Sequence, residues 1–334
     1  MRTFKNIAFI ILAVLFWTGF IGYGFIDGFL LRPITSKNNS EAFIEATKEK
    51  IEDEFVGNFA MTLIENGKIS QEYFYSIDQP VNENSVFPVA SISKWITSFG
   101  VLKLVEQGKL DLDQPIDNYL TRWNLPKSEF DNRKVTIRRL LSHSSGLVDD
   151  LGYEGFDSNE KVQTIEQSLT HASDAPYSEG VAIVGYEPGS QYMYSGAAYT
   201  ILQLLIEEVS GQSFNDYMAQ EVFEPLKMEN STFVPSEKPN LQFAQIYKDD
   251  GSTRKARKFT ALAAASLFTT TTDLSKFLLA NISNNSVLTK ETILEMSMPE
   301  TFINDYPVYG IGPHLYSQKA VSYTHLTLPT IYSV

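Results

Sequence analysis

The longest apolar run in the chain lies close to its N-terminus. Residues 7–26 contain no Asp, Glu, Lys or Arg, while Arg2 and Lys5 precede the run and residues 32–40 after it are polar. A helix of this length, at about 1.5 Å per residue, spans the roughly 30 Å hydrocarbon core of a bilayer. The pattern predicts an uncleaved membrane anchor within residues 1–32, with its basic N-terminus in the cytoplasm.

Two alternatives for this run stay open. Gly22-Tyr23-Gly24 supplies small residues at the spacing of a cleavage site, so the run could be a signal peptide that is removed. A buried core helix would also be apolar on every side. In either case residues 33–54 are predicted to form a linker and a first helix that lead into the main domain.

Beyond the linker, the pattern predicts a hairpin followed mainly by helices. Strand-like runs at 59–64 and 69–75 flank Asn66-Gly67, the favoured pair for a type I′ turn. Residues 92–105 are mostly apolar and are followed by Gly108, which predicts a buried helix that starts near Ser91. Further helices are predicted at 41–56, 137–141, 198–209, 214–222 and 273–280. Residues 149–187 are rich in Gly, Ser and Asp, which favours long loops around a site.

Composition narrows the class of protein. The chain has 334 residues, of which 43% are hydrophobic, and this predicts a globular protein with a substantial core. A formal charge of -13 opposes nucleic-acid binding, and the one basic cluster, residues 254–258, is short. The sequence contains no Cys, which excludes disulfides and thiolate nucleophiles, and its four His residues show no ligand spacing. No metal or organic cofactor is implied.

The candidate chemistry is Ser91-Ile92-Ser93-Lys94. A serine and a lysine three residues apart share one face of a helix, so the amine can take the hydroxyl proton. An ordinary N-cap serine is the alternative. The same spacing recurs at Ser158 to Lys161 and at Ser252 to Lys255, but only Ser91 opens an apolar helix. There the free backbone N–H of Ser91 can stabilise an oxyanion.

Several segments resemble one family in the same order along the chain. They are Phe-Pro-Val-Ala-Ser-Ile-Ser-Lys (87–94), the Gly-Lys-Leu-Asp segment (108–116), Thr-Ile-Arg-Arg-Leu-Leu-Ser-His-Ser-Ser-Gly-Leu (136–147), the Pro-Gly-Ser to Tyr-Ser-Gly segment (188–196), and the stretches at 222–228 and 263–270. The sequence is similar to the serine β-lactamase and penicillin-binding protein superfamily. It resembles most the branch of class C β-lactamases, D-alanyl-D-alanine carboxypeptidases and related esterases. The resemblance covers residues 55–316.

The resemblance implies a fold and a set of site residues. The fold would be α+β and β-lactamase/transpeptidase-like, with an antiparallel sheet flanked by helices and a helical subdomain beside it. Ser91 would be the nucleophile of an acyl-enzyme, and Lys94 and Tyr194 would share the general-base work. The alternative for Tyr194 is a structural role, as a packed aromatic residue whose hydroxyl is hydrogen-bonded. His143 is expected to support the site, and Gly196 stands where the family usually has Asn.

A second departure concerns the family's third motif, Lys-Thr-Gly or His-Thr-Gly. It should follow a segment such as Val308 to Gly312, and it is absent from the sequence. Its strand normally supplies the second oxyanion donor. After Lys319 the chain carries no charged residue. Residues 55–317 are therefore predicted to be a C-terminally incomplete hydrolase domain, with 318–334 a non-native tail, and this chain could be inactive.

Together these observations predict a single-pass bacterial membrane protein whose serine hydrolase domain lies on the extracytoplasmic side. Its substrates would be D-alanyl peptides of peptidoglycan, β-lactams or small esters. The alternative is a non-catalytic, penicillin-binding-like module that recognises peptidoglycan or a partner protein. No oligomeric state is implied.

Overall fold

The computed structural model describes residues 2–27, 34–37, 39–148, 153–176, 179–282 and 286–315. The chain divides into two compact units, Met1–Phe55 and Val56–Val334. The predicted tail at 318–334 lies outside the described residues.

The first unit contains two helices, α1 (Arg2–Asp27) and α2 (Ser40–Glu54). Asn39 caps α2, because its side-chain oxygen accepts a 2.8 Å hydrogen bond from the Ala42 N–H. Among the described residues, no helix combines the length and the hydropathy needed to cross a membrane. The anchor predicted for residues 7–26 therefore stays a prediction.

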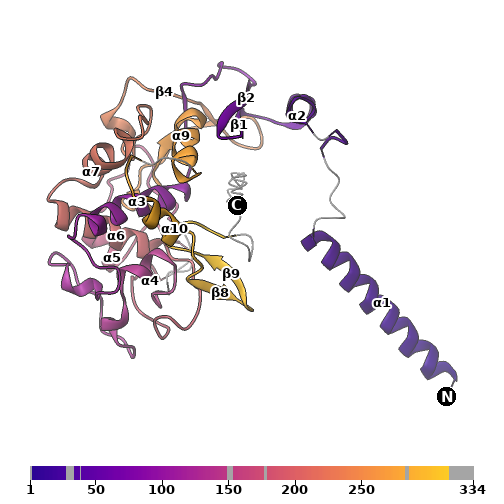
Figure 1. Ribbon diagram of the computed structural model, residues 1–334, viewed down its shortest axis with the longest axis horizontal. Helices are drawn as coiled ribbons and strands as arrows, with labels where there is room; N and C mark the ends of the chain where they lie inside the picture. Colours follow the sequence, from indigo (N-terminus) through magenta and orange to yellow (C-terminus); the bar gives the residue numbers. More distant parts are fainter. Residues whose placement is uncertain are drawn as a thin grey trace. The chain divides into compact units, whose positions relative to one another are not determined.

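The second unit mixes helices with short strands (Figure 1). Its helices are α3 (Ile92–Glu106), α4 (Ile137–Leu141), α5 (Ile165–Thr170), α6 (Gly196–Ser210), α7 (Phe214–Met218), α8 (Leu262–Ala265), α9 (Thr271–Ile282) and α10 (Lys290–Met296). Its strands are β1 (Asn58–Glu65), β2 (Lys68–Ser76), β3 (Ser85–Pro88), β4 (Gln242–Phe243), β5 (Ile246–Tyr247), β6 (Thr253–Arg254), β7 (Phe268–Thr269), β8 (Thr301–Ile303) and β9 (Tyr306–Tyr309). The predicted α+β class is confirmed.

The predicted hairpin is the antiparallel pair β1–β2. Asn66 and Gly67 both have positive φ, 52° and 73°, which a type I′ turn requires. β3 lies between β4, to which it is parallel, and β7, to which it is antiparallel. Two further antiparallel pairs, β5–β6 and β8–β9, complete the sheets that the described residues form. Each of these sheets has only two or three strands among the described residues, whereas the sequence predicts a single antiparallel sheet.

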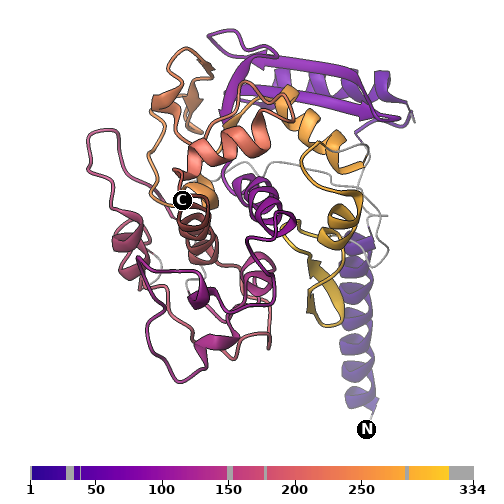
Figure 2. The ribbon, with the colours of Figure 1, turned by 60° about the vertical axis from the view of Figure 1, so that its left-hand side comes forward.

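The core of the second unit is built around α3, which lies in the interior with α6 and α8 against it (Figure 2). Phe99 of α3 is fully buried, and its ring centre lies 4.7 Å from that of Phe277 in α9. Trp95 packs edge-on against the same ring at 5.0 Å. Burying a side chain of this size contributes about 1.5 to 3 kcal/mol. The apolar residues of α3 therefore fix the helix that carries Ser91 and Lys94.

The ends of the helices differ slightly from the prediction. α6 begins at Gly196, two residues earlier than expected, because Ser195 caps it by accepting a hydrogen bond from the Ala198 N–H. Its C-terminal cap, Gly211, has the left-handed φ of 71°. The stretch expected to be loop contains α5, which starts with a reciprocal capping box between Thr164 and Gln167. That helix was missed because six residues show too little periodicity.

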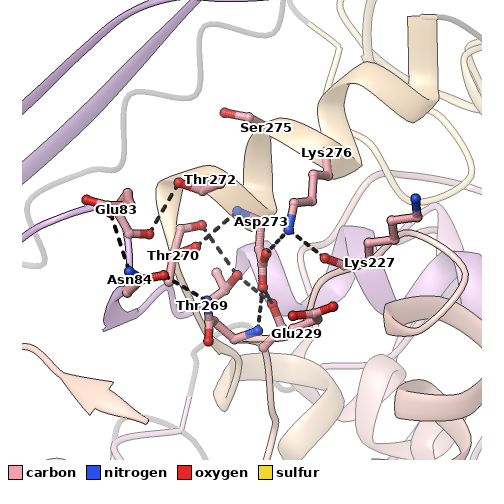
Figure 3. Close-up of polar contacts among 12 residues, drawn as sticks. Glu83, Asn84, Lys227, Glu229, Thr269, Thr270, Thr272, Asp273, Ser275 and Lys276 are labelled. Carbon is pink, nitrogen blue, oxygen red and sulfur yellow. Dashed lines mark hydrogen bonds and ion pairs between the residues drawn. The ribbon is translucent and has the colours of Figure 1, made fainter.

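A buried carboxylate ties the start of α9 to residues 230–231, and a neighbouring hydroxyl ties it to the chain before β3 (Figure 3). Asp273 is fully buried, accepts hydrogen bonds from the Asn230 N–H at 2.8 Å and the Ser231 hydroxyl at 2.9 Å, and pairs with Lys276 at 2.8 Å. One residue earlier, the Thr272 hydroxyl donates to the carbonyl oxygen of Glu83 at 3.2 Å. This network fixes the start of α9, and α9 in turn packs against α3.

Candidate active site

Ser91 stands where β3 turns into α3. The residue before it, Ala90, has a φ of +44°, which is unusual for a residue with a side chain. Ser91 occupies the N-cap position of α3, but its side chain makes no capping hydrogen bond and is exposed. The interpretation of Ser91 as an ordinary capping serine is therefore wrong, and its hydroxyl is available for chemistry.

Ser93 holds this turn in place. Its hydroxyl donates to the carbonyl oxygen of Ala90 at 2.5 Å and accepts from the N–H of Leu267 at 2.9 Å. The side chain is fully buried, so both hydrogen bonds are shielded from water. The Ser91 N–H, two residues before Ser93, has no hydrogen-bond partner among the described residues. It is therefore left free at the N-terminus of α3, where a developing oxyanion would be stabilised.

Lys94 lies one turn after Ser91 on the same face of α3. Its Nζ is 3.2 Å from the Ser91 Oγ and 2.7 Å from the carbonyl oxygen of Ala264 in α8. The side chain is 2% exposed, so the two acceptors hold the amine against the nucleophile. The other two Ser-x-x-Lys sequences lie in a turn and at the start of β6, outside any helix. They cannot bring their lysines to the serines in this way.

Tyr194, in the segment before α6, places its ring beside the amine of Lys94. The Lys94 Nζ lies 4.8 Å from the centre of the Tyr194 ring. A second ring, that of Tyr199, is 5.8 Å from Nζ and is completely buried. The Tyr199 hydroxyl is 3.0 Å from the Leu141 carbonyl oxygen, to which it donates, and burial raises its pKa. Tyr199 therefore remains protonated and structural, whereas Tyr194 is only half-buried and stands beside the lysine.

His143 packs against Tyr194 from behind, with the ring centres 4.4 Å apart. The imidazole is fully buried, and burial, together with the positive charge of Lys94, holds its pKa well below the usual value. The ring is consequently neutral at pH 7. Its Nδ1 accepts a 3.1 Å hydrogen bond from the Ser195 N–H, so the proton is on Nε2. His143 therefore lies beside Tyr194, and its supporting role stays a prediction.

Gly196 is buried at the first position of α6. Without a side chain it offers no amide to a substrate or to Lys94, which an Asn at this position would. The family's third motif, expected after Val308 to Gly312, is absent from the sequence. Among the residues that are described, no group of three or more His, Asp or Glu side chains is arranged to hold a metal ion.

Comparison with known proteins agrees with this geometry. The family model described as beta-lactamase matches residues 49–316, most of the chain. The chain belongs to the beta-lactamase family. This beta-lactamase-family chain is also similar to penicillin-binding protein 4* of Bacillus subtilis, with 31% identity over 204 residues. That alignment covers 59% of the chain and 42% of the relative, so the chain spans less than half of that protein.

Solved structures lead to the same fold. A penicillin-binding protein homologue from Pyrococcus abyssi, described as octameric, is 26% identical with a TM-score of 0.65, over 80% of this chain and 63% of that one. A penicillin-binding protein from Bacillus halodurans is 22% identical with a TM-score of 0.62, over 82% and 83% of the two chains. The second likeness concerns the fold alone. The class C-like branch assigned from sequence stays a prediction.

Two contacts of this beta-lactamase-family site were not anticipated from sequence. Ser93 is one of the two residues between Ser91 and Lys94, and a second hydroxyl so close to a turn is a usable signal in the sequence. Ala264 contributes through its backbone carbonyl, which no side-chain pattern identifies. It lies 170 positions from Lys94, so only the packing of α8 against α3 brings the two together.

Proposed function

We propose that the chain is a serine hydrolase that forms an acyl-enzyme at Ser91 on D-alanyl peptides, β-lactams or small esters. The observation that carries the proposal is the 3.2 Å separation between the Lys94 Nζ and the Ser91 Oγ at the start of a buried helix. An unassisted serine hydroxyl is a weak nucleophile and needs a nearby base. The half-buried Tyr194, whose ring centre lies 4.8 Å from the same amine, fits a general base shared with Lys94.

The chemistry follows from these contacts. The Ser91 Oγ attacks the substrate carbonyl carbon, and its proton passes to the Lys94 and Tyr194 pair. The carbonyl oxygen becomes an oxyanion near the Ser91 N–H, and the leaving group departs with a proton returned from the pair. Water, which gives a proton to the same pair, then attacks the carbonyl carbon of the acyl-enzyme. The bond to the Ser91 Oγ breaks, the oxygen takes the proton back from the pair, and the acid is released.

Acylation is the direct test. The 334-residue protein would be incubated with benzylpenicillin or with p-nitrophenyl acetate, and the intact mass measured. We expect one covalent adduct, none on Ser91→Ala, and about 100-fold or slower formation on Lys94→Met. Ser158→Ala is the matched control, since Ser158 also precedes a lysine by three residues but lies in a turn. Its adduct should form at the normal rate.

The same experiment distinguishes the alternative. An absence of adduct with either probe, in protein that is folded by circular dichroism, would contradict the hydrolase. It would favour a non-catalytic module that recognises peptidoglycan or a partner protein. An adduct that persists on Ser91→Ala would show that another residue is the nucleophile.

We also propose that residues 7–26 anchor the protein in a cell membrane with the second unit on the extracytoplasmic side. The support comes from the sequence: the run carries no Asp, Glu, Lys or Arg, and Arg2 and Lys5 precede it. Sodium carbonate extraction of cell membranes tests attachment, and external protease on intact protoplasts tests the side. Release by carbonate, or protection from the protease, would contradict the proposal.

A further inference from the structure

A polar cavity of about 690 Å³ lies in the second unit beside α4. Its walls come from the residues before and within α4, from residues 189–192, and from residues 300–302 at β8. None of Ser91, Lys94 and Tyr194 lines it. Cavities of this size hold small-molecule ligands in many proteins.

The cavity is lined by more positive than negative side chains. Four cationic residues, Arg133, Lys134, Arg138 and Arg139, face it together with two carboxylates, Asp113 and Glu300. The chain as a whole carries a formal charge of -13, so a cationic lining is opposite to the general field of the protein. Such a local excess attracts anions.

Most of these charges are already paired. Arg138 binds Asp113 at 2.8 Å and Glu300 at 3.0 Å, so its single charge is shared between both carboxylates of the lining. Arg133 pairs with Asp131 at 2.9 Å, and Lys134 pairs with Glu187. A ligand would gain little new interaction from these three cations.

Arg139 differs from them. No carboxylate of the described residues lies within ion-pair distance of it. The pKa of Asp113 is lowered mainly by the hydrogen bond from Arg138 and only secondarily by the more distant charge of Arg139. Its Nη1 donates to the Lys134 carbonyl oxygen at 2.6 Å. Its guanidinium lies against Gly189, where an added Cβ would come within 2.8 Å of Nη2. The half-buried guanidinium is therefore held in place, and its Nε and Nη2 donate no hydrogen bond to any described residue.

We propose that this cavity is an anion-binding site in which Arg139 binds a carboxylate or phosphate group of a small ligand. A planar guanidinium with two adjacent N–H groups matches the two oxygens of such an anion. Because Arg139 is fixed before the ligand arrives, little side-chain entropy is lost on binding. Ser190 and Gln191, which also line the cavity, offer hydroxyl and amide groups for the rest of the ligand.

Calorimetric titration of the 334-residue protein tests the site. Inorganic phosphate and glutarate are titrated separately at low ionic strength, with sodium chloride at the same ionic strength as the blank. We expect saturable binding of one anion per chain. Arg139→Gln should weaken it at least tenfold, and Arg139→Lys at least threefold, because a lysine keeps the charge but loses the fork of donors.

Arg133→Gln is the matched control, since this side chain also lines the cavity but is 83% exposed and paired with Asp131. It should change the affinity by less than twofold. Ser91→Ala should bind as the wild type does, so the result is independent of the proposed hydrolase activity. Tighter binding of phosphate than of glutarate identifies a phosphate ligand, and the reverse identifies a carboxylate.

Two results would overturn the proposal. One is the absence of saturable heat with both anions. The other is an equal loss of affinity in the Arg139→Gln and Arg133→Gln proteins, which would indicate general charge attraction without a site. Near-ultraviolet circular dichroism verifies that each variant is folded, and if Arg139→Gln is not, Arg139→Lys decides the outcome.

Discussion

Replacing Ser93 with Ala removes the hydroxyl that joins the two backbone segments around Ser91. In the native protein this hydroxyl donates to the Ala90 carbonyl and accepts from the Leu267 N–H, and it is fully buried. The substitution leaves that N–H without a partner in the core, which costs about 1 to 3 kcal/mol. It also removes the contact that holds Ala90 at a φ of +44°, a conformation that costs about 1 to 2 kcal/mol relative to ordinary backbone.

We therefore expect Ser93→Ala to lower the free energy of unfolding by about 2 to 3 kcal/mol. The turn should relax toward ordinary backbone, and this moves the Ser91 N–H from its place at the oxyanion. Acyl-adduct formation should slow about 100-fold or more, since one such donor contributes about 10²- to 10³-fold. Urea denaturation measures the stability, and the time course of the intact mass with the ester probe measures acylation.

Ser275→Ala is the matched control. Ser275 is 2% exposed, and its hydroxyl donates only to the Thr271 carbonyl within its own helix, at 2.8 Å. Removing a hydroxyl of this kind leaves no N–H unpaired, so the stability should change by less than about 1 kcal/mol. The reasoning is refuted if both alanine variants lose the same stability. It is equally refuted if Ser93→Ala is destabilised but acylates at the wild-type rate.

Three further predictions concern stability. Gly312→Ala should lower the free energy of unfolding, measured by urea denaturation, by more than about 3 kcal/mol. At this position φ is +106° and the new Cβ would lie 2.2 Å from the Ser98 hydroxyl oxygen. Gly67→Ala, with open space around it at a φ of +73°, should cost only about 1 kcal/mol, and similar losses for the two glycines would contradict the argument from close packing. Asp273→Ala should lower the free energy of unfolding by about 3 kcal/mol, because the Asn230 N–H, the Ser231 hydroxyl and the Lys276 ammonium all lose their acceptor. A loss below about 1 kcal/mol would mean that water takes the place of the carboxylate. The pKa of His143 is lowered in the folded protein, so below about pH 6.5 the unfolded chain binds more protons than the folded one. The free energy of unfolding therefore falls as the pH drops below that value, by up to about 1.4 kcal/mol per pH unit. Unfolding measured from pH 7.5 to 5.5 should show a shallower slope in His143→Asn, and an unchanged slope would disprove the assignment.

Local patterns predicted the elements that depend on neighbouring residues. The hairpin around Asn66-Gly67 was predicted because only residues that tolerate positive φ fit its turn, and the structure has both at positive φ. The buried helix after Ser91 was predicted from its continuous apolar run, and it spans Ile92–Glu106. The short helix α10 and the two-residue strands were not predicted, because such elements exist only through the contacts that the rest of the chain makes with them.

The side chains that could react are identifiable from sequence alone. A serine three residues before a lysine on one helix turn must present both groups on one face, and the structure has them 3.2 Å apart. Their surroundings depend on how the chain folds. They are the Ala264 carbonyl at the lysine, the hydrogen bond between Ser93 and Leu267, and the neutral His143 beside Tyr194. These contacts join residues far apart in the chain, or depend on burial, and no local pattern encodes either. Spacing along a helix is fixed by covalent geometry, whereas the environment of a group is fixed by what packs against it.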